Sequence, residues 1–348
     1  MAGKSRSAGS VHRTEKGKPN LQADQISEKG SEGKQMGKQT DCLVLRGVGG
    51  NYEMQSEQDG RRIFCRARGA LRRDDGIVLV GDRVTVEEDG MGAEVIASVK
   101  PRRNRLIRPP LANLDGFLVV AAVRDPAPIL DTVDKLLVIL THNRIPATVV
   151  ITKADLDGTG AESLAELYRR AGYAAYALSA QTGEGLEALR AEVSGRLQGG
   201  GILALGGASG VGKSSLLNAL YPALGLDTGA LSRKTARGKN TTRACALFPL
   251  DGGYIADTPG FSLLDFLRFD FLSCGDLPDA FPEIAARLGG CRYGDCRHIR
   301  EEECAIRRAV AAGEIAQSRY ACYCNLYELL RQKERSANGA SPSARNLV

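Results

Sequence analysis

The clearest pattern along the chain is a set of short apolar runs between about residues 104 and 270. Segments of helical periodicity, such as Ile129–Leu140 and Ala161–Ala171, lie between several of these runs. Strands that alternate with helices predict a mostly parallel sheet that is covered by helices on both faces. The runs expected to form its strands are Gly116–Val123, Ala147–Thr152, Ala174–Ser179, Ile202–Gly206, Cys245–Leu250 and Tyr254–Asp257.

The region from residue 41 to about residue 100 has shorter runs with turn residues between them. This spacing predicts a small all-β barrel or sandwich, and a five-stranded oligonucleotide-binding barrel (OB-fold) fits its size. Many small barrels bind no nucleic acid, so spacing alone leaves that function open, and the basic strand 61–68 favours it slightly. The expected strands are Cys42–Val48, Arg62–Ala67, Arg83–Glu87 and Ala93–Val99.

The two ends of the chain differ from both regions. Residues 1–40 lack aromatic residues and periodicity, which predicts a disordered basic tail. Its excess of Lys and Arg would allow a contact with nucleic acid, although a plain solvated tail is the simpler interpretation. We therefore expect a multidomain protein: a tail (1–40), an RNA-binding barrel (41–103), an α/β domain (104–270) and a mostly helical domain (271–348).

Composition narrows the class of protein. The 348-residue chain carries a net charge of +6, which only weakly indicates polyanionic partners. No run approaches the roughly 20 apolar residues of a membrane span, and the N-terminus carries no apolar secretory signal. Nine cysteines without an export signal indicate a reducing compartment. We expect a soluble cytoplasmic monomer with no membrane partner.

Residues 207–214 match the phosphate-loop pattern G-x-x-x-x-G-K-[ST] in full. An expected strand precedes the motif and an expected helix, Ser215–Leu220, follows it, so a chance glycine-rich turn is disfavoured. In such a loop, backbone N–H groups surround the phosphates, Lys213 reaches the β- and γ-phosphates and the Ser214 hydroxyl binds Mg²⁺. The residues expected to contact the nucleotide phosphates are Gly207, Ala208, Ser209, Gly210, Val211, Gly212, Lys213, Ser214 and Ser215.

Two further segments are typical of proteins that detect the γ-phosphate of a bound nucleotide. Asp257 ends an expected strand and begins the D-x-x-G sequence that closes at Gly260. An aspartate there holds Mg²⁺, usually through water, while the glycine N–H meets the γ-phosphate. Thr241 or Thr242, in a polar segment between the two motifs, would complete the Mg²⁺ shell.

Base recognition decides between GTP and ATP. The sequence Thr152-Lys153-Ala154-Asp155 resembles the guanine motif N-K-x-D, with threonine in place of the usual bracing asparagine. A carboxylate at Asp155 would accept two hydrogen bonds from guanine, whereas adenine would leave it unpaired at a cost of about 1–3 kcal/mol. The Lys153 stem would lie along the purine ring. Ser179 and Ala180 resemble the second guanine motif, in which a backbone N–H meets the base oxygen.

The order of these motifs is unusual, because both base motifs precede the phosphate loop. GTPases usually begin with the phosphate loop and end with the base motifs. The same sheet forms when the strand order is cut elsewhere, so the sequence predicts a circularly permuted GTPase domain. The switch that begins at Asp257 then runs almost directly into the C-terminal region.

Cys291, Cys296, His298 and Cys304 supply three thiols and one imidazole within fourteen residues. In a reducing compartment this set suits a structural Zn²⁺ site that is closed by four protein ligands. The alternative is a group of free thiols near a surface histidine. The remaining cysteines lie in apolar or helical patterns and are expected to be packing residues.

Taken together, these features resemble the RsgA (YjeQ) family of ribosome-associated GTPases over about residues 41–330. The resemblance implies an OB-fold barrel, a permuted GTPase and a zinc-binding domain. It also implies binding to the small ribosomal subunit, late maturation of that subunit, and GTP hydrolysis that accelerates on it. The barrel and the zinc domain would contact ribosomal RNA, in agreement with the arginines near 102–108. The sequences that carry the resemblance are 108–115, the phosphate loop, 257–262, and the cysteine cluster with 313–320.

Two departures from the family bear on catalysis. Asn240 stands where the family usually has histidine, and Arg243 stands where it has a third threonine. Phe261 occupies the position of the water-orienting glutamine of many GTPases, as in the family. We expect low intrinsic turnover that the ribosome restores. The alternative is an RNA-binding assembly scaffold that senses guanine nucleotide with little turnover, while Asp155 disfavours an ATP-dependent enzyme.

Overall fold

The computed structural model describes residues 39–69, 71, 77–107, 109–225, 245–257 and 272–339. The predicted tail therefore lies almost entirely outside the described residues. The first strand of the described residues begins at Thr40. Among the described helices, none combines the length and the apolar character that a membrane span requires.

Residues 40–99 form the predicted barrel. Its strands are β1 (Thr40–Val48), β2 (Asn51–Ser56), β3 (Arg62–Ala67), β4 (Arg83–Glu88) and β5 (Glu94–Val99). They pair in the order β1-β2-β3-β5-β4, and β4 pairs with β1, which closes the barrel. The sequence pattern did not predict β2, because Met54 is its only large buried apolar residue. The barrel core contains Cys42, Val44, Met54, Ile63, Val84, Val86 and Ile96.

The central sheet confirms the predicted α/β architecture. Its strands follow the order β10-β9-β8-β11-β13-β12, and every neighbouring pair is parallel except β13 and β12. All six expected strands are present, with ends that differ from the expected ones by no more than two residues. The strands are β8 (Gly116–Ala122), β9 (Ala147–Thr152), β10 (Ala174–Ala177), β11 (Ile202–Gly206), β12 (Ala246–Leu250) and β13 (Gly253–Asp257).

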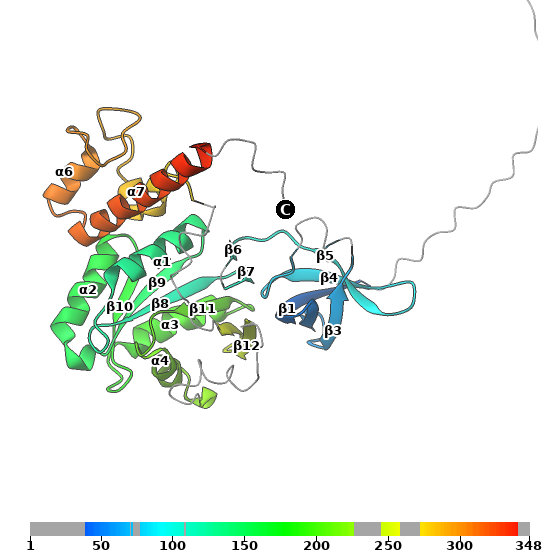
Figure 1. Ribbon diagram of the computed structural model, residues 1–348. Coiled ribbons are helices and arrows are strands. Elements are labelled where there is room, and N and C mark those ends of the chain that lie inside the picture. The colour runs from blue at the N-terminus through cyan, green and yellow to red at the C-terminus, as the bar shows by residue number, and fades with distance from the viewer. Residues whose placement is uncertain are drawn as a thin grey trace, which may run out of the picture. The chain divides into compact units, whose positions relative to one another are not determined.

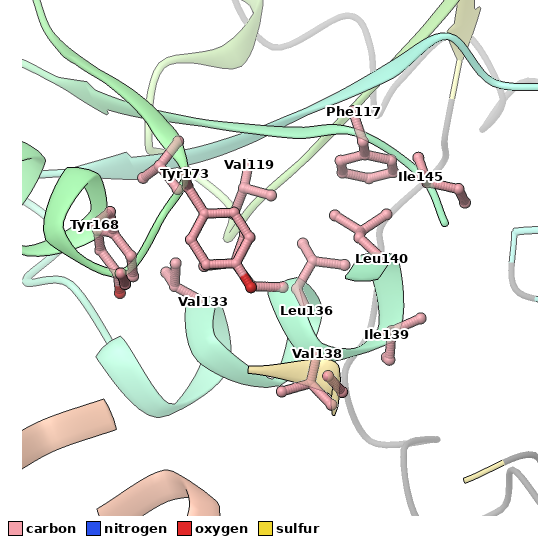
Figure 2. Packing of buried hydrophobic residues seen from close by; sticks show 14 of the residues in the cluster. Phe117, Val119, Val133, Leu136, Val138, Ile139, Leu140, Ile145, Tyr168 and Tyr173 are labelled. Atoms are coloured by element: carbon pink, nitrogen blue, oxygen red, sulfur yellow. The ribbon is translucent and has the colours of Figure 1, made fainter. Parts of the chain in front are cut away.

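Helices cover both faces of this sheet (Figure 1). Helices α1 (Leu130–His142) and α2 (Gly158–Arg170) share a core with Phe117 and Val119 of β8. Helices α3 (Leu186–Leu197) and α4 (Lys213–Leu220) share a second core with Leu118 and Val120. Alternate residues of one buried strand therefore serve two hydrophobic layers. Figure 2 shows the first layer, in which Leu136 and Leu140 of α1 point toward the side of Phe117 and Val119.

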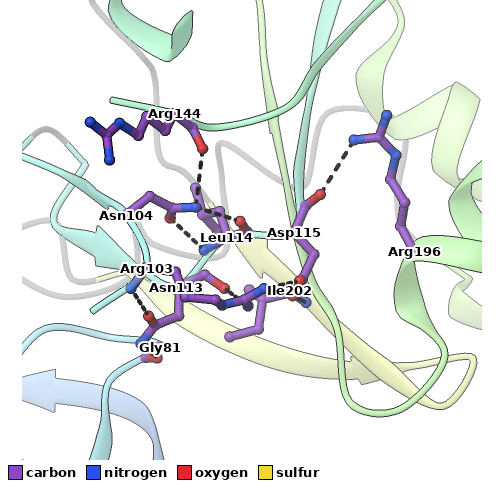
Figure 3. A network of polar contacts seen from close by, with 9 residues as sticks. All are labelled: Gly81, Arg103, Asn104, Asn113, Leu114, Asp115, Arg144, Arg196 and Ile202. Carbon is purple, nitrogen blue, oxygen red and sulfur yellow. Dashed lines mark hydrogen bonds and ion pairs between the residues drawn. The ribbon is translucent and has the colours of Figure 1, made fainter. Parts of the chain in front are cut away.

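A polar junction joins the barrel to the central sheet (Figure 3). The Asn113 amide donates to the Gly81 carbonyl at 2.9 Å, and its oxygen accepts the Arg103 N–H at 2.9 Å. Asn104 bonds both backbone groups of Leu114, at 2.8 and 2.9 Å. Close by lie the short strands β6 (Arg105–Leu106) and β7 (Leu111–Ala112). Strands β1 and β12 also pair across the junction.

Two arginines that the sequence suggested for RNA binding form ion pairs at this junction. Arg102 binds both carboxylate oxygens of buried Asp82 at 2.7 Å. Arg103 pairs with Asp115 at 2.7 Å but remains largely exposed. A bidentate bond to a buried carboxylate holds Arg102 in place, so its role here is structural. Arg108 lies outside the described residues.

The C-terminal region is mostly helical, as expected. It contains short helices η4 (Pro278–Ala280) and α5 (Pro282–Ala285), then α6 (Ala305–Ala311) and the long α7 (Gln317–Gly339). Cys322 of α7 is buried in the same core as α1 and α2, which confirms its expected packing role. Between residues 272 and 339 the chain adds no strand to the central sheet. The other short helices among the described residues are η1 (Ala154–Leu156) and η2 (Pro222–Leu224).

Candidate nucleotide site and metal centre

The phosphate loop lies between β11 and α4, as its motif requires. Gly207 passes so close to β8 that a Cβ there would stand 2.1 Å from the Val120 carbonyl oxygen. Gly212 takes a φ of 90° and directly precedes α4, which begins at Lys213, two residues earlier than expected. Glycine is the residue that tolerates both conditions. The loop therefore leads directly into the N-terminus of α4, the end of a helix that favours anions.

Lys213 folds back over the loop. Its Nζ donates to the Gly207 carbonyl at 3.0 Å and to the Ala208 carbonyl at 2.7 Å. Burial lowers the pKa of this ammonium group. Ala208, Ser209, Gly210 and Ser215 are exposed, whereas Val211 is buried beneath the loop. The ammonium group is thus held at the loop in which the sequence places the phosphates.

The two base motifs lie together at the carboxyl ends of neighbouring strands β9 and β10. The Ser179 hydroxyl donates to Asp155 Oδ1 at 2.5 Å. Asp155 is exposed in η1, so its other oxygen is accessible to a ligand. The Ser179 N–H already bonds the Glu184 carbonyl at 3.0 Å, which leaves the N–H of half-buried Ala180 as the better donor for a base oxygen.

Lys153 and Thr152 connect the base motif to its surroundings. Lys153 has a φ of 60°, and its Nζ donates to the Asp125 carbonyl. The buried Thr152 hydroxyl donates to the Val211 carbonyl at 2.6 Å and lies 3.2 Å from the Ala121 carbonyl. A side chain of the base motif therefore contacts the backbone of the phosphate loop directly. The contact of Lys153 with Asp125 had no signal in the sequence.

The switch residues are only partly described. Thr241, Thr242 and Gly260 lie outside the described residues. Asp257 ends β13, which pairs in parallel with β11, so its backbone approaches the loop side of the sheet. Ser214 lies half-buried in the first turn of α4. The Mg²⁺ shell expected from Ser214, Asp257 and the switch threonines stays a prediction.

An apolar cavity of about 410 Å³ borders the phosphate loop on the side of α1. Its lining includes Gly207 and Ala208, but neither Asp155 nor Ser179. It is therefore distinct from the surface where the sequence places the guanine base.

The four predicted zinc ligands converge in the C-terminal region. Their ligand atoms all lie within 4.8 Å of one another. Cys291 Sγ is 3.8 Å from Cys304 Sγ, and each sulfur is 3.5 Å from His298 Nδ1. Tetrahedral Zn²⁺ with bonds of about 2.3 Å to sulfur and 2.0 Å to nitrogen would require separations of about 3.8 and 3.5 Å. This Cys₃His group, which includes Cys296, is therefore compatible with zinc.

Residues without a recognisable motif support the loop that carries this Cys₃His group. Burial alone would raise the pKa of Glu301, but the N–H groups of Arg297, Ile299 and Arg300 bond its carboxylate and hold that pKa at about 2. The Tyr320 hydroxyl donates to the His298 carbonyl at 2.8 Å. Tyr320 belongs to the segment 313–320 that carried the family resemblance, whereas Glu301 had no signal.

Comparison with known families agrees with this geometry. The family model described as RsgA GTPase matches residues 99–267, and the one described as RsgA N-terminal domain matches residues 42–96. The small ribosomal subunit biogenesis GTPase RsgA of Moorella thermoacetica is 42% identical, covering 84% of this chain and 98% of the relative. The protein of the same name from Gemmatimonas aurantiaca is 41% identical, covering 84% of this chain and 97% of the relative.

Solved structures show the same similarity. The crystal structure of YjeQ from Thermotoga maritima has a TM-score of 0.69 at 34% identity, covering 84% of this chain and 99% of that one. YloQ, described as a circularly permuted GTPase, has a TM-score of 0.67 at 30% identity, covering 87% of this chain and 99% of that one. The chain therefore belongs to the RsgA GTPase family.

Proposed function

We propose that this chain hydrolyses GTP to GDP and phosphate, that the small ribosomal subunit stimulates it, and that it acts in late maturation of that subunit through binding to ribosomal RNA. One observation carries the nucleotide part: the Thr152 hydroxyl joins the guanine motif to a complete phosphate loop at 2.6 Å. The ribosomal part is supported by relatives that bear the name small ribosomal subunit biogenesis GTPase. Such a role belongs in the cytoplasm, and we expect a monomer.

The roles of the site residues follow from their chemistry. Lys213 exchanges its two carbonyl partners for phosphate oxygens and, with the loop N–H groups, stabilises the charge that develops during phosphoryl transfer. Asp155, oriented by the Ser179 hydroxyl, accepts the guanine N1–H and amino group. The N–H of Ala180 meets the base oxygen. These contacts select guanine and position its phosphates.

Hard oxygen ligands are available for Mg²⁺. The Ser214 hydroxyl and the Asp257 carboxylate suit this ion, and Thr241 or Thr242 would complete its shell. When bound, Mg²⁺ neutralises charge on the β- and γ-phosphates. Its position in the D-x-x-G motif predicts that the Gly260 N–H bonds the γ-phosphate. In the C-terminal domain, Cys291, Cys296, His298 and Cys304 would hold one structural Zn²⁺ per chain.

The decisive test is GTP turnover by the purified chain with and without purified small ribosomal subunits. We expect slow turnover alone and a clear acceleration by the subunits, with little competition from ATP. Lys213→Ala is the matched control, since it should lower kcat by about 10²–10³ while the fold is retained. Nucleotide binding without any accelerated turnover would instead support the scaffold, and equal affinity for ATP would contradict guanine selection by Asp155.

A further inference from the structure

The outer face of the barrel carries an exposed aromatic residue between arginines. Along β3, Ile63 and Cys65 point into the barrel, so Arg62, Phe64 and Arg66 point outward. Phe64 is 70% exposed, which is unusual for a large apolar side chain on a regular strand. Since packing within the barrel does not use this ring, the ring is available to a ligand.

Neighbouring strands extend this surface across the sheet. Phe64 lies opposite Glu53 of β2, and Glu53 lies opposite Arg46 of β1. Arg66 lies opposite Asn51. We call Arg46, Glu53, Phe64 and Arg66 the Phe64 face. These four residues are among those that line a shallow hollow of about 380 Å³, a volume within the range of ligand sites.

The charge of this face is positive and only partly balanced. Its carboxylate, Glu53, pairs with Arg62 at 3.0 Å. Arg66 Nε donates to the neutral Asn51 amide oxygen at 2.8 Å, and among the described residues this arginine has no carboxylate partner. Within the part of the chain that the structure describes, Arg46 forms no ion pair. Two guanidinium groups beside an exposed ring therefore favour an anionic ligand that also presents a flat apolar face.

We infer that the Phe64 face binds unpaired RNA, with a base stacked on Phe64 and the flanking phosphates on Arg46 and Arg66. This inference rests on the proposed ribosomal function, and it identifies the surface of the barrel that would bind the ribosomal RNA. Base–aromatic stacking with nearby cations is how such folds hold single strands. A duplex hides its base faces, so the ligand must be single-stranded. A protein partner fits less well, because Phe64 and Val48 are the large apolar residues that these three strands expose.

The chain contains no tryptophan, so a single substitution provides a clean optical probe. Phe64→Trp places the sole indole at the stacking position, and titration with a single-stranded oligoadenylate of about 12 nucleotides should quench it saturably. Ile77→Trp is the matched control, since Ile77 is 71% exposed on the barrel but outside the Phe64 face. Its emission should not respond, and a duplex of equal length should quench neither variant.

Two further variants separate stacking from charge. Phe64→Ala should weaken oligoadenylate binding by about 5-fold to 150-fold without changing its salt dependence. A plot of log affinity against log salt concentration has a negative slope when phosphates are bound. Arg66→Ala should reduce the magnitude of that slope by about one, the contribution of one phosphate contact. Equal quenching of Phe64→Trp and Ile77→Trp, or unchanged affinity of Phe64→Ala, would overturn the inference.

The proposed function is tested separately by subunit-stimulated GTP turnover of the unsubstituted chain. If that turnover is present while Phe64→Ala binds oligoadenylate normally, the Phe64 face is wrong and the function stands. If Phe64→Ala weakens binding to small subunits but not to oligoadenylate, the face binds ribosomal protein and the RNA assignment fails. If the unsubstituted chain is not stimulated but Phe64→Ala still loses oligoadenylate affinity, the face is correct and the proposed function fails.

Discussion

At the scale of single residues, Thr152 is the most informative departure from the guanine motif. The motif usually carries asparagine, whose amide braces the pocket, and threonine removes that amide. Here the threonine hydroxyl, 2% exposed, reaches the Val211 carbonyl at 2.6 Å and lies 3.2 Å from the Ala121 carbonyl. The smaller residue thus retains a contact between the base motif and the phosphate loop. We infer that Thr152 acts mainly on the loop and only indirectly on the base.

This inference predicts the effect of Thr152→Val, which keeps the shape of the side chain and removes its hydroxyl. The buried Val211 carbonyl loses its partner, a loss worth about 1–3 kcal/mol. Affinity for GTP and GDP should therefore fall together, by about 5-fold to 150-fold, while the preference over ATP persists because Asp155 is intact. Titration with fluorescent nucleotides measures both, and Thr152→Ser should restore binding. A variant that loses only its guanine preference would contradict this role.

At the scale of elements, a buried arginine joins the C-terminal region to the central domain. Arg319 of α7 is 1% exposed and bonds both oxygens of Glu283 at 2.7 and 3.2 Å. It also bonds Asp134 of α1 at 3.1 Å, and its guanidinium lies 4.8 Å from the ring centroid of Phe281. Burial raises the pKa of Asp134 in spite of this arginine. Arg319 is bonded to both Glu283 and Asp134, so removing its guanidinium group leaves two buried carboxylates without this cation.

We therefore expect Arg319→Met to destabilise the fold by about 3–5 kcal/mol, as broken buried ion pairs do. The loss should be smaller near pH 5 than near pH 8. When the pKa of a carboxyl is higher in the folded state than in the unfolded state, the free energy of unfolding falls as the pH rises through these two pKa values. The buried carboxyl is therefore less costly to the fold at low pH, where it is protonated. Denaturant unfolding at both pH values measures this, with exposed Arg292→Met as the control. An equal loss at both pH values would show that packing, rather than charge, decides the effect.

The sequence predicted elements better than contacts between them. Strands β8, β9 and β11 were visible because buried parallel strands are continuously apolar. Strand β2 was not, since its neighbours supply most of the barrel core around a single methionine. The convergence of Cys291, Cys296, His298 and Cys304 was predicted by residue type and spacing. In contrast, Arg319 meets Asp134 across 185 positions, and no local pattern encodes such a pair. Thr241, Thr242 and Gly260 stay predictions.

At the scale of the whole molecule, the distinctive feature is the order in which the strands of the central sheet follow one another along the chain. Strands β9 and β10, which carry the base motifs, precede β11 with the phosphate loop, yet all three lie in one sheet. After β13 the described residues 272–339 add no strand to this sheet, and α7 packs against α1 through Arg319. The Cys₃His group therefore lies far along the chain from the phosphate loop and the base motifs, and hydrophobic and ionic contacts of α7 with α1 lie between them.

This separation predicts what zinc removal does. The protein should contain one zinc per chain by elemental analysis, and a chelator should release it. Zinc in small domains contributes about 10–16 kcal/mol of apparent folding energy, so residues 291–304 should then become sensitive to protease. Guanine nucleotide affinity, measured after Mg²⁺ is restored, should persist, because Thr152, Asp155 and the phosphate loop pack on the central sheet. Cys304→Ser should reproduce the protease sensitivity without a chelator. Loss of GTP binding in parallel with zinc would show instead that the nucleotide pocket depends on the C-terminal domain for its shape.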